Sequence, residues 1–566
     1  MHIGEQLVDQ LIEYGVEHVF GCPGGQTLPL YSGITRRPGQ IDHVLMRDER
    51  SAIYAADGYA RAKNRVGVCD ATVGPGASNL VSGLIEAYAC STPLLAIVSD
   101  IPRQWEHRRY LAAANQAFDQ RGFLEASAKS FGHVDTPENL GEILQSCVRI
   151  ATSGRPGPVV LSIPADVFVA EEDGGRFPVA ADWAEIPRLR PGPDPDVVAQ
   201  ASDLLASSQR PTIVAGGGVL HAQAGEEVQA LAELLGCPIA TTMSGKGTVA
   251  ETHPLSVGVV GRMGHAIANS IIAESDCVVF VGCKTGQATT LAWTVPKQDV
   301  SVIQIDIDPA EVGRNYRNAV GLFSDARLGV SALTAALRGR KLRSDWDGKT
   351  LRGRLKTWWE GPVEYAADAE LGVLKPQDVV RSMRAIAADD AVMVADASLA
   401  TGWVMGHWQV IEPGRRIFSP RGMGGLGWGL PGAIGVSVAG RGTSDPGRVV
   451  CLAGDGGWAY SLGEVETATR LGLPIISVIL NNSTLAWIKH HAGSRFPGEK
   501  MVPDFAEVDY AESARGLGAV VRRVESLDAF EAAFAEAIAD EPTRPWVIET
   551  RSSDLETPVL PSSGGY

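Results

Sequence analysis

The chain has 566 residues, which is enough for three or more domains that each bury a core of their own. Hydrophobic residues make up 45% of it and charged residues 20%, as is usual for globular proteins, and its apolar runs are too short to span a membrane. The net charge of −16 disfavours nucleic acid and anionic membrane surfaces as partners. The eight cysteines include no Cys-x-x-Cys pair, which argues against a disulfide framework, and the N-terminus has no targeting pattern, so we expect a cytoplasmic protein.

Short apolar runs alternate with segments of helical period along most of the chain. Because these runs are apolar on both faces and are separated by helices, they indicate parallel strands joined by helical crossovers. The sequence therefore predicts an α/β protein made of three doubly wound parallel-sheet domains. The strand-like runs are residues 66–69, 94–98, 159–163, 212–215, 278–281, 302–305, 392–395, 449–452 and 475–480.

Two stretches mark the expected boundaries between these domains. Residues 187–196 (PRLRPGPDPD) contain four prolines, which favour an extended connector, and residues 338–362 are charged with little apolar face. The prediction is an N-terminal domain at 1–180, a middle domain at 190–340 and a C-terminal domain at 365–550. The last segment, 551–566, has no helical or strand period, so we expect a tail that is disordered or folded over a neighbour.

The third domain carries the strongest chemical signal. An apolar strand runs into Gly-Asp-Gly-Gly at 454–457, and after a helix a second apolar strand ends at Asn482, 27 residues beyond Asp455. A carboxylate and an amide at the ends of two parallel strands bring two oxygen ligands to one edge of a sheet, where a hard cation and a phosphate group can bind. The alternative is that Gly-Asp-Gly is a turn and Asn-Asn a strand cap.

This spacing resembles the cofactor motif of thiamine diphosphate-dependent enzymes. The resemblance implies that Asp455 and Asn482 hold Mg²⁺ through their side chains and Thr484 through its carbonyl oxygen. Within the glycine-rich segment 421–431, Leu426 matches the apolar residue that supports the cofactor in a V shape. The cofactor-binding residues implied by the resemblance are Gly25, Asp396, Ser398, Gly424, Leu426, Gly454, Asp455, Gly456, Gly457 and Asn482. An Asp and a Ser at a strand end, such as Asp396 and Ser398, are also typical helix caps.

Catalytic candidates follow from the same resemblance. Glu49 stands nine residues before Gly58 of an Asp-Gly-Tyr-Ala-Arg segment, and in the family a Glu at this spacing shares a proton with the aminopyrimidine ring and so activates the cofactor. An acid in the first turn of a helix, favoured by the macrodipole, is the alternative reading of Glu49. Gln116 lies where relatives place a polar residue over the thiazolium, and a polar loop residue is its alternative. With Leu426, these two complete the catalytic set.

Other segments resemble acetolactate synthases in particular. Residues 74–79 (GPGASN) are similar to their TSGPGATN segment, and residues 20–25 are similar to their FGVPGG turn. In this family the site lies between the N-terminal domain of one subunit and the C-terminal domain of another, which implies a homodimer or homotetramer. The middle domain, with glycines at 216–218, binds FAD in some members, ADP in others and nothing in the rest. Lys284 stands where flavin-binding synthases usually have Arg, so the choice stays open.

The overall resemblance is to the acetolactate synthase large subunit. It implies a Mg²⁺-dependent carboligase in which a 2-oxo acid loses CO₂ and the remaining carbons join a second carbonyl. Enzymatic alternatives are a 2-oxo acid decarboxylase similar to benzoylformate decarboxylase and a 2-hydroxyacyl-CoA lyase. Those decarboxylases carry Ser and His where this chain has Gly25 and Thr72. A non-catalytic cofactor-binding paralogue is the third alternative, but cofactor binding alone would not require Glu49. His490 and His491 are either substrate contacts or a solvated helix end.

Overall fold

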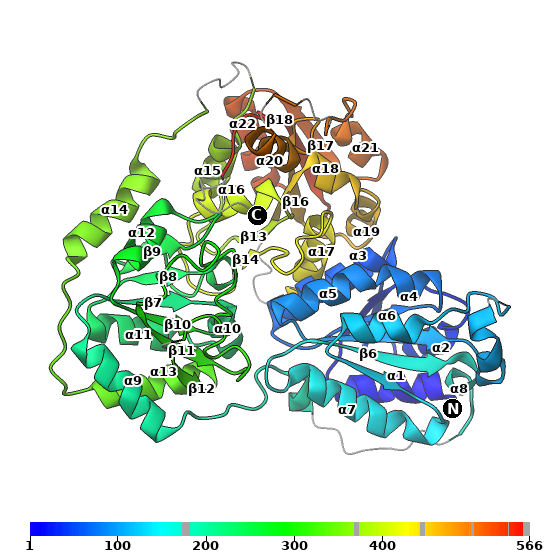
Figure 1. Ribbon diagram of the computed structural model, residues 1–566. Coiled ribbons are helices and arrows are strands. Elements are labelled where there is room, and N and C mark those ends of the chain that lie inside the picture. Colours follow the sequence, from blue (N-terminus) through cyan, green and yellow to red (C-terminus); the bar gives the residue numbers. More distant parts are fainter. Residues whose placement is uncertain are drawn as a thin grey trace.

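The computed structural model describes residues 1–111, 113–172, 181–317, 319–366, 373–441, 448–496, 498–499, 503–541 and 543–558. Three blocks are visible in Figure 1: an N-terminal one (blue to cyan), a middle one (green) and a C-terminal one (yellow to red). Each is built on a six-stranded sheet whose neighbouring strands all pair in parallel, with helices between the strands. The predicted α/β class with three doubly wound parallel sheets is confirmed.

The N-terminal sheet has the strand order β2-β1-β3-β4-β6-β5. Strands β3, β4 and β6 are buried at every position because their apolar side chains face helices on both sides. The strands are β1 (His18–Gly21), β2 (Asp42–Leu45), β3 (Gly67–Ala71), β4 (Leu94–Asp100), β5 (Ser130–His133) and β6 (Pro158–Pro164). The helices are α1 (Ile3–Glu13), α2 (Leu28–Thr35), α3 (Glu49–Lys63), α4 (Pro75–Asn79), α5 (Val81–Cys90), α6 (Gln120–Ser127), α7 (Leu140–Thr152) and α8 (Ala165–Phe168).

The middle sheet has the order β12-β11-β10-β7-β8-β9. Its strands are β7 (Pro211–Ala215), β8 (Ile239–Thr241), β9 (Ser256–Val259), β10 (Cys277–Val281), β11 (Ser301–Asp306) and β12 (Ala319–Phe323). Its helices are α9 (Pro195–Ser207), α10 (Gly217–Ala222), α11 (Gly225–Leu235), α12 (Ala266–Glu274) and α13 (Ala326–Leu337). Helix α14 (Gly348–Glu360) follows on the outer flank of this block, within the charged stretch 338–362, and leads to the C-terminal block (Figure 1).

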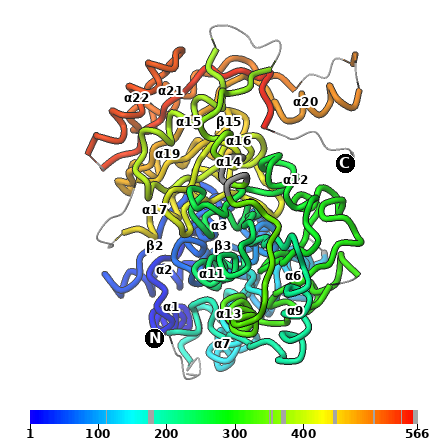
Figure 2. The backbone as a smooth tube through the Cα atoms, turned by 90° about the vertical axis from the view of Figure 1, so that its left-hand side faces the viewer, coloured from blue at the N-terminus to red at the C-terminus, as the bar shows by residue number. Residues whose placement is uncertain are grey.

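The C-terminal sheet has the order β14-β13-β15-β16-β18-β17. Its strands are β13 (Val392–Ala395), β14 (Ile417–Phe418), β15 (Val449–Gly454), β16 (Ile475–Asn481), β17 (Val520–Val524) and β18 (Trp546–Arg551). Its helices are α15 (Pro376–Ile386), α16 (Leu399–His407), α17 (Gly429–Ala439), α18 (Asp455–Ala459), α19 (Glu464–Arg470), α20 (Ala486–Arg495), α21 (Tyr510–Gly516) and α22 (Leu527–Ala539). In the tube view of Figure 2, α20 stands out from this block.

Helices α3 and α17 join the N-terminal and C-terminal blocks. An ideal Cβ on Gly58 would lie 2.3 Å from the carbonyl oxygen of Gly432, and one on Gly435 would lie 1.9 Å from that of Ala55. The backbones therefore touch directly, which only glycine allows at these two points. One hydrophobic core runs through the contact and includes residues of both sheets.

A buried ion pair of the middle block contacts the C-terminal block. Lys246 Nζ lies 2.6 Å from Glu251 Oε1, and both side chains are almost fully buried. The other oxygen of Glu251 accepts a 2.8 Å hydrogen bond from the backbone N–H of Val410, which follows α16. Trp358 of α14 donates a 2.8 Å hydrogen bond to the carbonyl oxygen of Gly406 beside it.

The first residues of the expected tail are ordered against the C-terminal block of their own chain. Glu556 is 5% exposed, and its Oε2 accepts hydrogen bonds from the side chain of Gln377 and the backbone of Ala366. Residues 559–566 lie outside the described part of the chain. Among the described helices, none has both the length and the apolar character that crossing a membrane requires.

Candidate active site

The carboxyl ends of β13, β15 and β16 surround a cavity in the C-terminal block. Most of the residues predicted to bind a cofactor or a metal line it together. These are Asp396, Ser398, Leu426, Gly454, Asp455, Gly456, Gly457, Asn482 and Thr484. Pro376, Leu480, Trp487, Ser553 and Glu556 also contribute to the wall, and the sequence motifs had not pointed to them. Parallel strands end at one edge of their sheet, which is why residues from 396 to 484 meet here.

The donor set of this cavity suits a hard cation. Asp455 begins α18 and is 2% exposed, and burial raises the pKa of its carboxyl to about 6 despite the backbone N–H groups of Gly456 and Ser483. A buried carboxylate of this kind is stabilised by a cation. Asn482 contributes an amide oxygen, which accepts a 3.3 Å hydrogen bond from the backbone N–H of Thr484. Carboxylate, amide and carbonyl oxygens are the ligands that Mg²⁺ and Ca²⁺ prefer.

The glycines at the end of β15 have two different roles. An ideal Cβ on Gly454 has no atom within 4 Å, so the backbone there is open to the cavity. An ideal Cβ on Gly457 would lie 2.1 Å from Oδ2 of Asp396. Gly454 thus forms part of a cradle in which phosphate oxygens can approach backbone amides, while Gly457 makes room for the Asp396 carboxylate.

Asp396 holds the loop that carries Leu426. Its Oδ1 accepts hydrogen bonds from the backbone N–H groups of Trp428 and Gly429, and its Oδ2 accepts one from Gly427, all between 3.0 and 3.2 Å. The carboxylate is therefore occupied by the protein's own backbone. Ser398 precedes α16 with φ 69° and makes no side-chain cap hydrogen bond, so its hydroxyl does not serve as the helix cap that the sequence left as an alternative.

Glu49 belongs to a second group of predicted residues, in the N-terminal block. It is the first residue of α3, which Asp48 caps, and its Oε2 accepts a 2.9 Å hydrogen bond from the side chain of Asn79. An ideal Cβ on Gly76 would lie 3.1 Å from Oε1 of Glu49. Asn79 stands in the GPGASN segment, whose resemblance to acetolactate synthases does not by itself indicate a role for this side chain.

Gln116 lies next to this group in a left-handed conformation with φ 61°. Its Oε1 accepts a 3.3 Å hydrogen bond from Gln26, whose own Oε1 accepts a 2.9 Å hydrogen bond from the hydroxyl of Thr72. Gln26 was missed because a glutamine after a Gly-Gly turn carries no motif. Gly25 is exposed, and an ideal Cβ there would touch nothing within 4 Å, so a larger residue would fit.

The two groups do not meet in one chain. All residues that line the C-terminal cavity lie between 376 and 556, whereas Glu49, Gln116 and Gly25 belong to the N-terminal block. Gly424 also lies outside the cavity lining, in the exposed part of the Leu426 loop. The Nε2 atom of His490 lies 3.0 Å from the carbonyl oxygen of Glu556, so this histidine contacts the start of the tail.

A second, larger cavity of about 400 Å³ lies between the middle block and the other two. Its wall includes the glycines at 216–218, the segments 282–284 and 286–289, the end of β11, the end of α5 and Arg421 with Gly422. An ideal Cβ on Gly216 would lie 2.1 Å from the carbonyl oxygen of Gly282, so β7 and β10 end in tight contact beneath the cavity. This is the switch-point position where open α/β sheets bind ligands.

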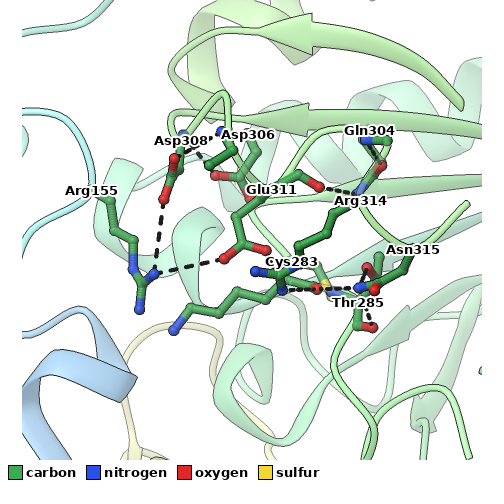
Figure 3. Close-up of polar contacts among 12 residues, drawn as sticks. Arg155, Cys283, Thr285, Gln304, Asp306, Asp308, Glu311, Arg314 and Asn315 are labelled. Carbon is green, nitrogen blue, oxygen red and sulfur yellow. Dashed lines mark hydrogen bonds and ion pairs between the residues drawn. The ribbon is translucent and has the colours of Figure 1, made fainter. Parts of the chain in front are cut away.

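Acidic and basic side chains meet at one end of this larger cavity, as Figure 3 shows. Arg155, from the N-terminal block, lies 3.8 Å from Asp308 and 3.6 Å from Glu311, and Arg314 lies 2.6 Å from Glu311. Burial raises the pKa of Asp306, the last residue of β11, to about 6. Lys284 donates to the carbonyl oxygen of Ala89, and burial lowers the pKa of its ammonium group.

Comparison with known proteins assigns the family. Residues 1–123 match the family model described as thiamine pyrophosphate enzyme, N-terminal TPP binding domain; residues 198–333 match the central domain; and residues 396–550 match the C-terminal TPP binding domain. The chain belongs to the thiamine pyrophosphate enzyme family, whose cofactor is the molecule also called thiamine diphosphate. The resemblance inferred from the motifs is thereby confirmed.

Within this family, the chain is similar to curated acetolactate synthases. The chain is 32% identical to a probable acetolactate synthase large subunit of Methanococcus aeolicus, over 96% of this chain and 91% of the relative. It is 35% identical to an acetolactate synthase of Arthrospira platensis, over 85% of this chain and 82% of that protein. It is 34% identical to an acetolactate synthase large subunit of Parasynechococcus marenigrum, over 88% and 80% respectively.

Proposed function

We propose that this protein is an acetolactate synthase-like carboligase that takes a 2-oxo acid such as pyruvate as donor. The observation that carries the proposal is the meeting of Asp455, Asn482, Thr484 and Leu426 around one cavity, in a chain similar to acetolactate synthase large subunits over nearly its whole length. When bound, thiamine diphosphate would supply a nucleophilic carbon for the substrate carbonyl and a cationic ring that serves as the sink for the electrons released by loss of CO₂.

Each group around the cavity has a distinct task in this proposal. Asp455, Asn482 and the Thr484 carbonyl would hold Mg²⁺, the open backbone at Gly454 would receive the diphosphate, and Leu426 would support the ring system. Glu49 would hold the proton at the pyrimidine nitrogen, in the orientation that Asn79 gives it.

The separation of Glu49 from the cavity of its own chain supports an active site that lies at an interface between two subunits. A carboxylate on the N-terminal sheet acts on a cofactor held by a C-terminal sheet only if a second copy supplies one of the two. We therefore propose a homodimer, or a dimer of dimers, in which each site combines the two groups from different copies.

The N-terminal group favours ligation over release of an aldehyde. Release requires a proton donor beside the reacting carbon. Gly25 has no side chain, and the Thr72 hydroxyl already donates to Gln26, so neither replaces the Ser and His of benzoylformate decarboxylases. This argues for carbonyl attack, in which two pyruvate molecules give one acetolactate and one CO₂.

For the larger cavity we propose a nucleotide ligand. Its volume of about 400 Å³ is in the range of cofactor sites, and the Asp306 carboxylate at a strand end suits ribose hydroxyl groups, while Arg155, Lys284 and Arg421 suit phosphates. The absorption spectrum of the purified protein reports a flavin, and titration calorimetry with ADP reports a nucleotide without one.

The proposed activity is tested by incubating the protein with Mg²⁺, thiamine diphosphate and pyruvate, and by measuring acetolactate and CO₂. Acetolactate formed with one CO₂ per two pyruvates supports the carboligase. Free aldehyde without acetolactate indicates the decarboxylase, turnover only with 2-hydroxyacyl-CoA esters indicates the lyase, and cofactor binding without turnover of any of these indicates a non-catalytic paralogue. The Asp455→Asn variant is the control, since it should lose Mg²⁺-dependent cofactor binding.

A further inference from the structure

The loop from Arg421 to Gly429 is held by two buried carboxylates, one on each side of Leu426. Asp396 accepts the backbone N–H groups of Gly427, Trp428 and Gly429, as described above. On the other side, Glu86 of α5 accepts those of Gly422, Met423 and Gly424 at 2.8, 2.7 and 3.1 Å. Each carboxylate is 1% exposed, and Leu426 lies between the two sets of donors.

The position of loop residues 422–424 depends on their hydrogen bonds to Glu86. The residues Gly422, Met423 and Gly424 are all exposed, so few apolar contacts hold them in place. Gly424 and Gly427, on either side of Leu426, have φ angles of +68° and +84°. Because glycine can adopt many other backbone conformations, these angles are kept only while the loop is anchored at both ends. Burial raises the pKa of Glu86, but Arg61 and the loop N–H groups outweigh burial and keep it below its usual value, so the carboxylate is charged.

We propose that Glu86 and Asp396 are positioning residues that together set where Leu426 projects into the cofactor cavity. The inference deepens the proposed function and rests on it for the role of Leu426. It also gives the N-terminal block two tasks: Glu49 would serve the site shared with the partner subunit, and Glu86 would order the loop that supports the cofactor in its own chain. In this proposal Asp396 anchors the loop and does not contact the diphosphate, because its carboxylate and the diphosphate are both negatively charged and would repel each other.

Hydrogen exchange of backbone amides tests the two anchors without any cofactor. In Glu86→Gln an N–H₂ group replaces one accepting oxygen, so we expect exchange at 422–424 to be about ten- to a hundredfold faster while 427–429 stay unchanged. In Asp396→Asn the pattern should reverse. The matched control is Glu464→Gln, because Glu464 is equally buried and also joins the blocks, through the backbone N–H of Arg47, but does not touch the loop. Should Glu86→Gln not fold, Glu86→Asp keeps the charge beside Arg61 but is too short to reach all three donors.

The effect on the cofactor is read from the exchange of the C2 proton of bound thiamine diphosphate and from kcat. We expect Glu86→Gln to lower both about tenfold with little change in cofactor affinity. We expect the same of Leu426→Ala, and we expect the double variant to be no worse than Leu426→Ala alone. Unchanged exchange at 422–424, faster exchange throughout the loop in Glu464→Gln, or additive effects in the double variant would overturn the proposal. If the protein binds no thiamine diphosphate, the proposed function fails, whereas the amide exchange still decides whether the two carboxylates anchor the loop.

Discussion

The side-chain amide of Asn79, the last residue of α4, donates a 2.9 Å hydrogen bond to Oε2 of Glu49, the first residue of α3. This bond ties the carboxylate to the GPGASN turn and leaves Oε1 facing the Cα of Gly76. The orientation of the proposed catalytic acid is thus fixed from a second helix, and glycine at position 76 keeps the space beside it free.

Replacing Glu49 by Gln should lower turnover by about 10²- to 10⁴-fold, because the amide keeps the shape but cannot exchange a proton with the cofactor. Thiamine diphosphate affinity, measured by quenching of tryptophan fluorescence, should stay near that of the wild type. Asn79→Ala is the matched control: it removes the orienting bond but keeps the acid, and we expect a loss of about tenfold. Full activity in Glu49→Gln would disprove the assigned role.

Two neighbouring glycines should respond in opposite ways to alanine. Gly457→Ala places a methyl group 2.1 Å from the Asp396 carboxylate and should cost about 2 kcal/mol or more of folding free energy. Gly454→Ala meets nothing and has a φ of −77° that alanine adopts readily, so unfolding should change by less than about 0.5 kcal/mol. Its methyl group projects into the cavity, however, so thiamine diphosphate affinity should fall. Urea unfolding without cofactor and a binding titration measure the two effects, and equal stability losses in both variants would contradict the geometry.

The third prediction concerns the contribution of the buried ion pair of Lys246 and Glu251 to stability. Glu251→Gln keeps an acceptor for Val410 but leaves the Lys246 ammonium group buried without a counter-charge, which typically costs about 3–5 kcal/mol. Lys246→Met combined with Glu251→Gln removes both charges and should recover most of that loss. Urea unfolding of the two single variants and the double variant gives the coupling energy, and additive losses would show that the pair does not interact as described.

The fourth prediction concerns pH. Asp70 is fully buried, with its carboxyl bonded to the hydroxyl of Tyr31, and burial raises its pKa to about 8. Burial lowers the pKa of His43, 3.8 Å from Asp70, to about 4. Between pH 6.5 and 8 the folded chain therefore holds a proton on Asp70 that the unfolded chain has lost, so stability should fall by about 1.4 kcal/mol per pH unit. Between pH 4 and 6.5 the unfolded chain holds an extra proton on His43, and the two effects oppose each other.

Asp70→Asn removes the ionisable group but still accepts from Tyr31. Its free energy of unfolding should lack this fall between pH 6.5 and 8, so the variant should gain stability relative to the wild type as the pH rises. Urea unfolding at pH 6.5, 7.2 and 8 measures the difference, and parallel pH profiles for the two proteins would show that Asp70 is ionised in the folded state.

The sequence predicted the central strands of each sheet but few of the outer ones. The apolar runs at 94–98, 278–281 and 475–480 correspond to β4, β10 and β16, which are buried on both faces. Edge strands gave no such signal. β2 has the sequence Asp-His-Val-Leu with two exposed residues, and β14 has only two residues, so neither shows a recognisable period.

In the candidate site, too, residues in short sequence motifs could be predicted, whereas residues that act through partners far away in the sequence could not. Asp455, Asn482 and Leu426, which line one cavity, were predicted because each lies in a short motif with fixed spacing. Glu86 was not predicted, since its partners in the loop lie more than 330 residues away and are backbone N–H groups, which any residue except proline supplies. Asp396 was identified by position, but its task could be seen only from the loop that folds over it.

The contact of α3 with α17 has a mechanical consequence. Glu49 begins one of these helices, and the other starts three residues after Leu426, at Gly429. With backbone against backbone at Gly58 and Gly432, there is no layer of side chains that could slip or repack between them. The part of the chain that connects Glu49 to Leu426 through these helices is therefore as stiff as the helices themselves. Any motion that opens or closes the site around the substrate therefore has to come from loops at its rim or, in the proposed dimer, from movement between the two copies.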